Sequence, residues 1–377
     1  TGLTKAPELP ATTLAERCYD SMFRNCTSLT QAPDLPAPAL APYCYAVMFR
    51  GCTGLTKAPE LPATTLAERC YNTMFKDCTG LTQAPALPAT TLADYCYHCM
   101  FEGCTELTQA PALPATTLAP DYCYGGMFRD CTSLTQAPEL PATTLAPSCY
   151  NSMFQNCTGL TQAPELSATT LALSCYANMF NGCTGLTQTP ELPATTLAVR
   201  CYNVMFSGCT GLTQVPALPA ATLADYCYAR MFEGCTGLTQ VPALPATTLA
   251  TNCYFRMFLN CTGISLHTQG PGTAWSIPAG AVAATGWSAG MFEGTSGTFT
   301  GNPVIGTPYY YTPPCLTFLS AQSFTITPQE ALWDGQIECS TDGQNWAAFG
   351  TAGATAAADG SGTYKLYLQG TDNTRIS

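Results

Sequence analysis

One 26-residue unit repeats ten times along this chain. Residues 1–26 read TGLTKAPELPATTLAERCYDSMFRNC, and residues 53–78 read TGLTKAPELPATTLAERCYNTMFKDC. The units begin at Thr1, Thr27, Thr53, Thr79, Thr105, Thr132, Thr158, Thr184, Thr210 and Thr236. Every unit has 26 residues except the fifth, which gains one residue at Pro120-Asp121. A period of this length is typical of a solenoid, in which each unit buries a face against its neighbours.

The second half of each unit predicts an amphipathic helix. Within 15–26, apolar residues recur at i, i+3, i+4, i+7, i+8 and i+11, which is one face of a helix. The residue before the second cysteine is Gly, Asn or Asp in all ten units, and these types tolerate the left-handed backbone that ends a helix. We therefore expect a helix from about Leu14 to Arg24, and helices at the matching positions elsewhere.

The first half of each unit predicts a short strand. Proline occupies the seventh position of all ten units, from Pro7 to Pro242, and a stacked ladder would lose the same donor at every level there. We therefore expect three or four strand residues before this proline, followed by an extended turn. The fold class that follows is an α/β solenoid of ten strand-turn-helix coils over 1–261.

The unit L-T-x-A-P-x-L-P-A-T-T-L-A-x-x-C-Y-x-x-M-F-x-x-C-T resembles the BspA-like leucine-rich repeats of bacterial surface proteins. The match covers 1–261, and similar repeats occur in phage and prophage-encoded fibre proteins. The resemblance implies an extracellular or cell-surface binding protein of the adhesin type. It supplies no catalytic motif.

The chain after 261 predicts two further parts. Residues 262–311 are expected to form a degenerate capping repeat and linker, because Met291–Thr295 mirrors the Met-Phe-x-x-Cys of the repeats with Thr in place of Cys. Residues 312–377 contain short runs of strand-forming residues and predict a small all-β, sandwich-like module.

Composition excludes two classes of function. The chain has 13 Lys+Arg against 24 Asp+Glu and a formal net charge of −11, which argues against a nucleic-acid binder because such a protein needs a basic surface. No run of 18 apolar residues is present, so no membrane span is expected. The chain begins without Met or an apolar signal segment, and we expect that processing or the choice of fragment removed the natural start.

The sequence predicts no catalysis, no cofactor and no metal site. His98 and His267 are the only histidines and lie in unlike contexts, so we expect one at an exposed helix position and the other in a loop. Six carboxylates recur at the eighth position of the unit, whereas a paired-carboxylate site would be unique. We therefore interpret these carboxylates as a solvated face.

The cysteines predict buried thiols. Ten units account for 20 of the 23 cysteines, and the Cys-x₇-Cys spacing is not that of a zinc site. Eight residues of helix would place Cys18 and Cys26 about 12 Å apart, too far for a disulfide. Small buried hydrophobic residues are the favoured interpretation, with disulfides between units as the alternative. Cys315 and Cys339, on neighbouring strands of the β module, are the candidate disulfide.

One row of polar residues is the candidate ligand-binding site. The fifth position of the unit carries Lys5, Gln31, Lys57, Gln83, Gln109, Gln136, Gln162, Gln188, Gln214 and Gln240. The row is either a solubilising face or a periodic surface for an extended ligand.

The leading hypothesis is a secreted or cell-surface recognition array for protein or glycan ligands. The alternative is a structural subunit of an extracellular filament or phage-type fibre, assembled head-to-tail from copies of itself. The first unit supports this alternative because it is as apolar as the fifth, so we expect an upstream segment or another subunit to cover it.

Overall fold

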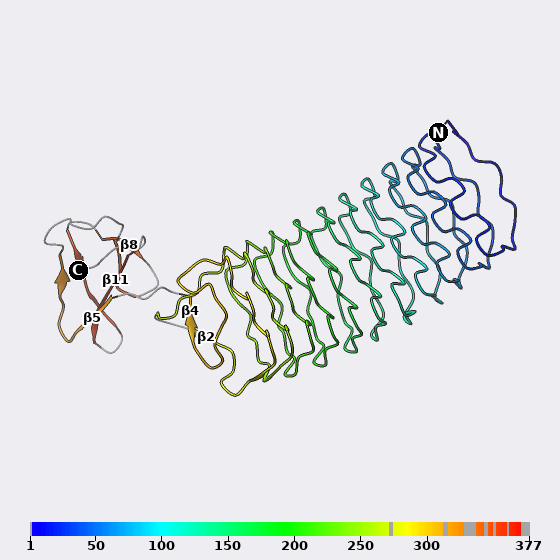
Figure 1. The fold of residues 1–377 in the computed structure, drawn as a ribbon. Coiled ribbons are helices and arrows are strands. Elements are labelled where there is room, and N and C mark those ends of the chain that lie inside the picture. Colours follow the sequence, from blue (N-terminus) through cyan, green and yellow to red (C-terminus); the bar gives the residue numbers. More distant parts are fainter. Residues whose placement is uncertain are drawn as a thin grey trace. The chain divides into compact units, whose positions relative to one another are not determined.

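The computed structural model describes residues 2–270, 274–311, 316–327, 337–342, 346–349, 352–359 and 362–370. The chain divides into two compact units. Unit 1 comprises Thr1–Ile264, Ser276–Ser296 and Thr300–Thr307, and unit 2 comprises Ser265–Trp275, Gly297–Phe299 and Pro308–Ser377. In unit 1, coloured from blue to yellow in Figure 1, the chain winds into stacked coils. We number these coils 1–10 in the order of the repeats, and the next coil is coil 11.

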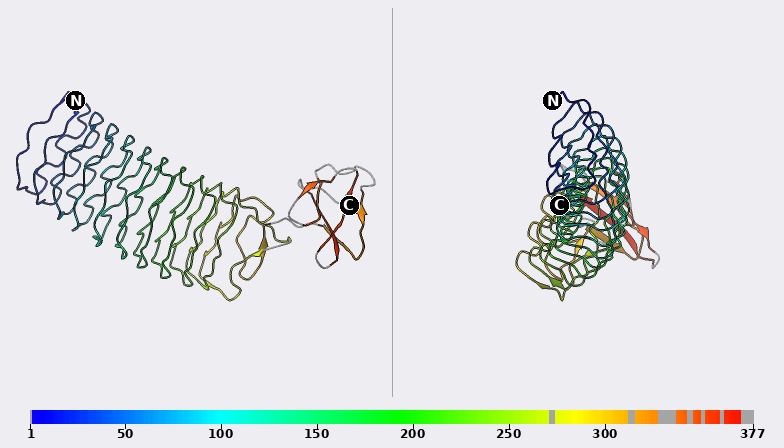
Figure 2. Two further views of the ribbon diagram at one scale, coloured as in Figure 1. Left: turned by 180° about the vertical axis from the view of Figure 1, so that it is seen from behind. Right: turned by 90° about the vertical axis from the view of Figure 1, so that its right-hand side faces the viewer.

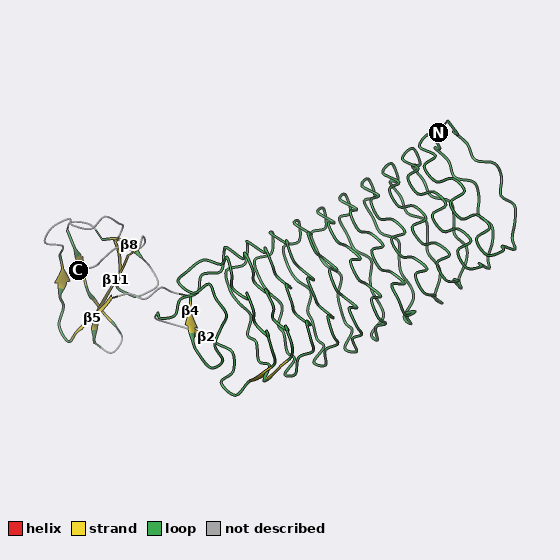
Figure 3. Ribbon diagram, in the orientation of Figure 1, coloured by secondary structure: helices red, strands yellow, loops and turns green. Residues whose placement is uncertain are grey.

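The expected strand-turn-helix solenoid is wrong, because the described residues contain no helix (Figure 3). Residues 16–25 form a series of turns where the sequence predicts a helix from Leu14 to Arg24, and the equivalent residues of the other coils do the same. Its apolar residues come in pairs every four positions, Cys18-Tyr19 and then Met22-Phe23. Over three repeats, a period of four residues stays close to the 3.6-residue period of a helix, so both periods place the same apolar residues on one side. The sequence pattern therefore fits both structures.

Backbone N–H groups in these turns alternate between two kinds of acceptor. The N–H of Tyr19 donates to the carbonyl of Cys44 in the next coil at 3.0 Å, whereas the N–H of Asp20 donates to the carbonyl of Arg17 in its own coil at 3.2 Å. The same alternation continues along the stack, with each inter-coil bond reaching 25 or 26 residues ahead in coils 1–9. Each coil is thus a ribbon of reverse turns bonded to its successor. The reverse view in Figure 2 shows the successive coils stacked along unit 1.

Every fourth residue of the ribbon adopts a positive φ. In coil 1 these residues are Arg17, Ser21 and Asn25, with φ of 58°, 60° and 59°. In coil 2 even the β-branched Val47 has φ 59°, a conformation that costs roughly 1–2 kcal/mol for such a residue. Val47 also donates an inter-coil hydrogen bond to Asn72 at 2.9 Å, so the ladder offsets part of that cost.

Two ladders of aromatic rings run through the core of unit 1. The Tyr45 and Tyr71 rings stack with centroids 6.0 Å apart, and the Phe49 and Phe75 rings stack at 5.5 Å. The phenylalanine ladder continues into coil 11, where Phe292 stacks on Phe258 at 5.5 Å. Each stacked pair adds about 0.5–1.5 kcal/mol beyond area burial, and the repeated rings fix the register of successive coils.

The proline-rich half of each coil is extended and makes few inter-coil backbone contacts. Parallel bridges occur at its two ends, for example Gln136↔Gln162 at the fifth position and Thr170↔Thr196 at the thirteenth. In coil 10 the second contact widens into strand β1 (Thr248–Leu249), which pairs in parallel with β3 (Val282–Ala283) of coil 11. Between these ends Leu9, Leu35 and their equivalents point into the core.

The described residues of unit 2 hold three sheets. β2 (Ala274–Trp275) pairs antiparallel with β4 (Tyr309–Tyr310). The remaining strands are β5 (Leu316–Ser320), β6 (Thr325–Ile326), β7 (Ile337–Ser340), β8 (Ala347–Ala348), β9 (Ala354–Thr355), β10 (Ala357–Ala358) and β11 (Tyr364–Gly370). A five-stranded sheet has the order β10-β11-β7-β8, with β5 also paired to β11, and β6 pairs separately with β9. Ile337, Phe349 and Leu368 form a small core.

Two glycines test the inter-coil packing. Gly182 and Gly208 occupy the same position in coils 7 and 8 with φ 77° and 73°. A Cβ on Gly182 would overlap Oδ1 of Asn156, whereas a Cβ on Gly208 would meet only the Cα and the backbone N of Gly182, both at 3.7 Å. We expect Gly208→Ala to cost about 1–2 kcal/mol of unfolding free energy from left-handed strain alone.

Gly182→Ala should cost about 1 kcal/mol more, because moving Asn156 breaks its 2.8 Å hydrogen bond to Asp130. Urea denaturation of both variants measures the difference. Equal destabilisation would contradict the close packing at this position.

Candidate functional site

The ten predicted ligand-binding residues lie in one exposed row on unit 1. The side chains at the fifth position, from Lys5 to Gln240, are all exposed. Parallel bridges join several neighbours directly, including Lys5↔Gln31 and Gln109↔Gln136. The structure therefore brings together residues that lie about 26 positions apart in the sequence.

Three further exposed rows share this face, which we call the proline face. The eighth position carries a carboxylate in six coils and alanine in four. The tenth position carries exposed proline in nine coils, from Pro10 to Pro245, and Ser167 in coil 7. The twelfth position is mostly threonine. Leucine at the ninth position is buried beneath them.

Open grooves separate successive coils on the proline face. The groove between coils 2 and 3 has a volume of about 780 Å³ and is lined by Gln31, Asp34, Lys57 and Glu60 together with prolines. Similar grooves lie between coils 1 and 2, 3 and 4, and 8 and 9, with volumes of about 410, 450 and 460 Å³. Grooves lined by polar side chains and prolines thus repeat along the stack of coils.

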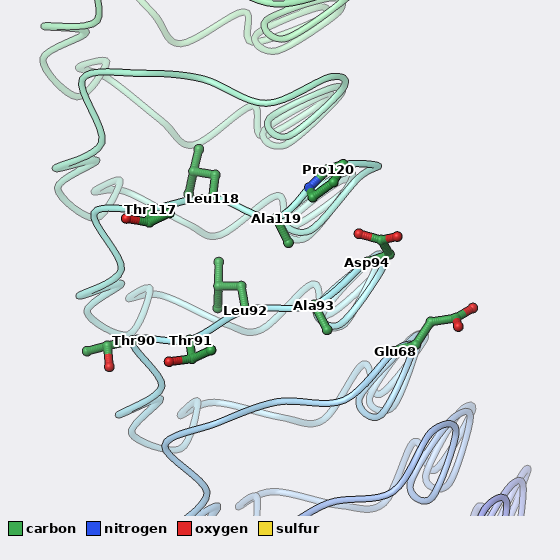
Figure 4. Close-up of a pocket in the computed structure, with 10 residues that line it drawn as sticks. All are labelled: Glu68, Thr90, Thr91, Leu92, Ala93, Asp94, Thr117, Leu118, Ala119 and Pro120. Carbon is green, nitrogen blue, oxygen red and sulfur yellow. The ribbon is translucent and has the colours of Figure 1, made fainter.

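A different groove lies at the twelfth to sixteenth positions of coils 3–5, where the threonines lead into the turns. Figure 4 shows Leu92 and Leu118 from successive coils facing this groove, with Glu68, Asp94 and Pro120 at the ends of the turns. Its volume is about 520 Å³. Burial raises the pKa of Asp94, and the neighbouring carboxylates Asp121 and Glu68 raise it further.

One non-repeated cluster occurs in coils 3–5, of which coil 5 is the 27-residue coil. Glu102 is buried, with 5% of its surface exposed, and forms ion pairs with Arg129 and with Lys76 at 2.9 Å. Burial acts to raise the pKa of Glu102, but hydrogen bonds from Arg129 and Lys76 outweigh it and hold that pKa below its ordinary value. The carboxylate is therefore ionised and neutralised inside the stack.

His98 and Cys99 belong to the same cluster and form a Cys-His-Asn arrangement. Cys99 Sγ lies 3.5 Å from Nε2 of His98, and Nδ1 of His98 lies 3.1 Å from Nδ2 of Asn72. Burial lowers the pKa of His98 to about 4 and raises the pKa of Cys99 to about 12. A thiolate nucleophile needs the opposite shifts, so the contacts here serve packing.

The two histidines differ from what the sequence predicts. His98 is half-buried among turns, because no helix forms there. His267 is buried and lies 3.2 Å from the hydroxyls of Ser265 and Thr298.

A ladder of tyrosines and arginines, missed by the sequence analysis, follows the seventeenth position of coils 1–5. The guanidinium of Arg17 lies 4.2 Å from the ring centre of Tyr43, and that of Arg69 lies 4.5 Å from the ring centre of Tyr95. Tyr122 stacks on Tyr95 at 5.4 Å. The alternation of Arg and Tyr at 26-residue intervals over coils 1–4 was visible in the sequence, but the expected helix placed these residues on an unstacked outer face.

The repeat cysteines are buried, as predicted, although not on a helix. Cys18 is exposed, Cys26 is half-buried, and the other eighteen are buried free thiols. The second cysteine of coils 2–10 donates to the phenylalanine carbonyl of the coil before it, as Cys183 does to Phe154 at 3.0 Å. Burial raises the pKa of Cys183 to about 12. Cys315 lies outside the described residues, so its disulfide with Cys339, half-buried on β7, stays a prediction.

Two kinds of feature are absent from the described ranges. No group of three or more His, Cys, Asp or Glu side chains there is arranged to hold a metal ion. No helix there is long and apolar enough to cross a membrane.

Comparison with models of known protein families, with curated proteins and with solved structures finds no match. The resemblance to the BspA-like repeats therefore stays a prediction.

His98 predicts a specific loss of stability in acid. Its pKa is about 4 in the folded chain against 6.5 for a free side chain, so the unfolded chain binds the extra proton between these values. The stability that neutral His98 contributes to the folded chain is complete above pH 6.5 and is lost as the pH falls toward 4. Between pH 7 and 4.5 the wild type should lose about 1–3 kcal/mol more than His98→Gln. Urea denaturation at the two pH values measures this, and parallel losses would contradict it.

Buried thiols predict slow alkylation of the folded chain. Iodoacetamide at pH 8 should modify Cys18 readily, because it is exposed, and leave Cys104 and Cys157 unmodified, because burial holds the pKa of both thiols well above the ordinary value. All three should react in urea. Peptide mass mapping reads the sites, and rapid labelling of Cys157 in the folded chain would contradict the burial.

Proposed function

We propose that this chain is a secreted or cell-surface recognition protein whose proline face binds an extended protein or glycan partner. The observation that carries the proposal is the exposed Lys/Gln row, which recurs in register in ten coils beside grooves of 410–780 Å³. Glutamine offers both donors and acceptors, which suits hydroxyl and amide groups of a partner.

The repeated geometry favours a long partner over a small one. Each groove is open and shallow, so one coil offers a weak contact. A partner that crosses several coils makes the same contact repeatedly, and the later contacts form at high effective concentration. The extracellular location is supported by the resemblance to bacterial surface repeats.

The absence of catalysis is part of the proposal. The single Cys-His-Asn arrangement has its pKa values shifted away from nucleophilic chemistry, as described above for His98 and Cys99.

The alternative is a head-to-tail filament subunit. It is favoured by the stacking itself, because the ring contact that joins Tyr19 to Tyr45 repeats from coil to coil and suits a contact between copies of the chain. Sedimentation of the full chain over a range of concentrations tests it, and a monomer at all concentrations would count against self-assembly.

The binding proposal is tested on immobilised arrays of glycans and extended peptides. The wild-type chain should bind a subset of them, and the variant Gln83→Ala/Gln109→Ala/Gln214→Ala/Gln240→Ala should bind these several-fold more weakly. These four coils carry alanine at the eighth position, so the variant reports on the glutamine row alone.

Gln155→Ala is the control, since Gln155 is the same residue type on the turn-rich half of coil 6. Equal binding by the fourfold variant and the wild type would overturn the role of the proline face.

A further inference from the structure

The two halves of each coil are joined to the next coil by different kinds of contact. One half is the turn ribbon, by which we mean residues 16–25 of coil 1 and their equivalents in the other coils. Between coils 2 and 3, hydrogen bonds across the ribbon run from Tyr43 to Glu68 at 2.9 Å and from Gly51 to Lys76 at 2.8 Å, with three more between them. The ribbon is therefore bonded to the next coil across its whole width.

The proline-rich half has no comparable bonds. Proline at the seventh and tenth positions has no N–H to donate, and nine of the ten coils carry both prolines. In coils 1–9, the described residues at the seventh to eleventh positions form no backbone hydrogen bond with a neighbouring coil. The leucines at the ninth position pack beneath them. Apolar packing is non-directional, so it tolerates a change in spacing better than a hydrogen bond does.

The spacing between coils is nearly constant at the core ladders and varies on the proline face. The stacked tyrosine rings lie 6.0 Å apart between coils 2 and 3, and 5.8 Å apart between coils 3 and 4 and between coils 8 and 9. The grooves at these three junctions have volumes of about 780, 450 and 460 Å³. Successive coils therefore spread apart by different amounts on one half while they keep their spacing in the core.

The backbone contacts vary in the same way. A parallel bridge at the fifth position joins Lys57 to Gln83 between coils 3 and 4, whereas no bridge between described residues joins Gln31 to Lys57 between coils 2 and 3. Hydrogen bonds across the turn ribbon are present at both of these junctions and at all the others of coils 1–10. The contacts on the proline face are thus optional, and those of the ribbon are not.

This asymmetry makes the turn ribbon a hinge. A coil that tilts relative to the next one about the ribbon keeps the ribbon bonds and changes only the width of the groove on the opposite side. Each coil contacts only its neighbours, so small tilts at successive junctions add up along the stack. Collective hinge motions of this kind take place in microseconds to milliseconds.

We propose that unit 1 bends about its turn ribbon, so that the grooves of the proline face open and close while the ribbon keeps its length. The inference goes beyond the proposed function, because it assigns a motion to the fold and needs no partner. Distances along the proline face then vary from molecule to molecule, and distances along the ribbon do not.

Double electron–electron resonance on the full chain, with nitroxide labels on non-canonical residues, measures both distances. One pair of labels replaces Gln31 and Gln188, which are exposed on the proline face of coils 2 and 8. The matched pair replaces Val47 and Val204, which lie half-buried on the ribbon of the same coils, both with φ 59°. The proline-face distribution should be about twice as broad, because displacement grows with distance from a hinge. Both labelled chains must keep the urea midpoint of the wild type.

A cross-linked variant separates tilting of the coils from motion of the labels. Parallel bridges join Lys57 to Gln83 and Gln109 to Gln136, so cysteines at these four positions lie about 4.8 Å apart in pairs, within disulfide range. Oxidation of Lys57→Cys/Gln83→Cys/Gln109→Cys/Gln136→Cys with diamide should narrow the proline-face distribution by about a fifth, because independent tilts are lost at two of the six junctions. Dithiothreitol should restore the width.

The ribbon pair in the same cross-linked chain is the control and should keep its width. Equal widths for the two pairs of labels would overturn the inference. An unchanged proline-face width after both disulfides have formed would overturn it as well, because the breadth would then come from the labels.

Discussion

Unit 1 depends on one pattern of hydrogen bonding, in which alternate backbone N–H groups bind the next coil. The bonds from Tyr19 to Cys44 and from Val47 to Asn72 are two steps of the same ladder. The ladder holds successive coils at one spacing, and the aromatic rings at 5.5–6.0 Å occupy the interior that this spacing creates. Every exposed row on the surface is a consequence, because a side chain at one position is repeated directly beside its equivalent.

The repeat and the buried positions could be predicted from the sequence, whereas the backbone conformation could not. Tyr45, Phe49 and Cys52 are buried as their apolar spacing indicates. The helix was wrong because paired apolar residues every four positions satisfy a ribbon of turns as well as a helix. At two of the three left-handed positions, residues such as Val47 carry no local sign of that conformation. Only the hydrogen bonds between coils, which are contacts between distant residues, select it.

Part of the candidate site could likewise be predicted from the sequence, and part could not. Exposure of the Lys/Gln row follows from polar residues at a fixed repeat position, and it was predictable. The Arg17–Tyr43 contact and the ion pairs of Glu102 depend on which side chains of successive coils meet. The predicted helix would have kept these side chains apart. The proline face likewise becomes a set of grooves only when coils are stacked in register.

The Glu102 cluster has a consequence for how the stack finds its order. Coils 1 and 3 differ in sequence only at Asp20/Asn72, Ser21/Thr73, Arg24/Lys76 and Asn25/Asp77. One of these coils could therefore take the place of the other in the stack. A stack that skipped coil 3 or coil 5 would keep its aromatic ladders and its exposed rows. It would also separate Glu102 from Lys76 or Arg129 and leave a carboxylate enclosed with less compensating charge, at a cost of several kcal/mol. The ion triad of Glu102, which joins coils 3 and 4 to the single 27-residue coil, thus distinguishes the native order of these three coils from its near-copies.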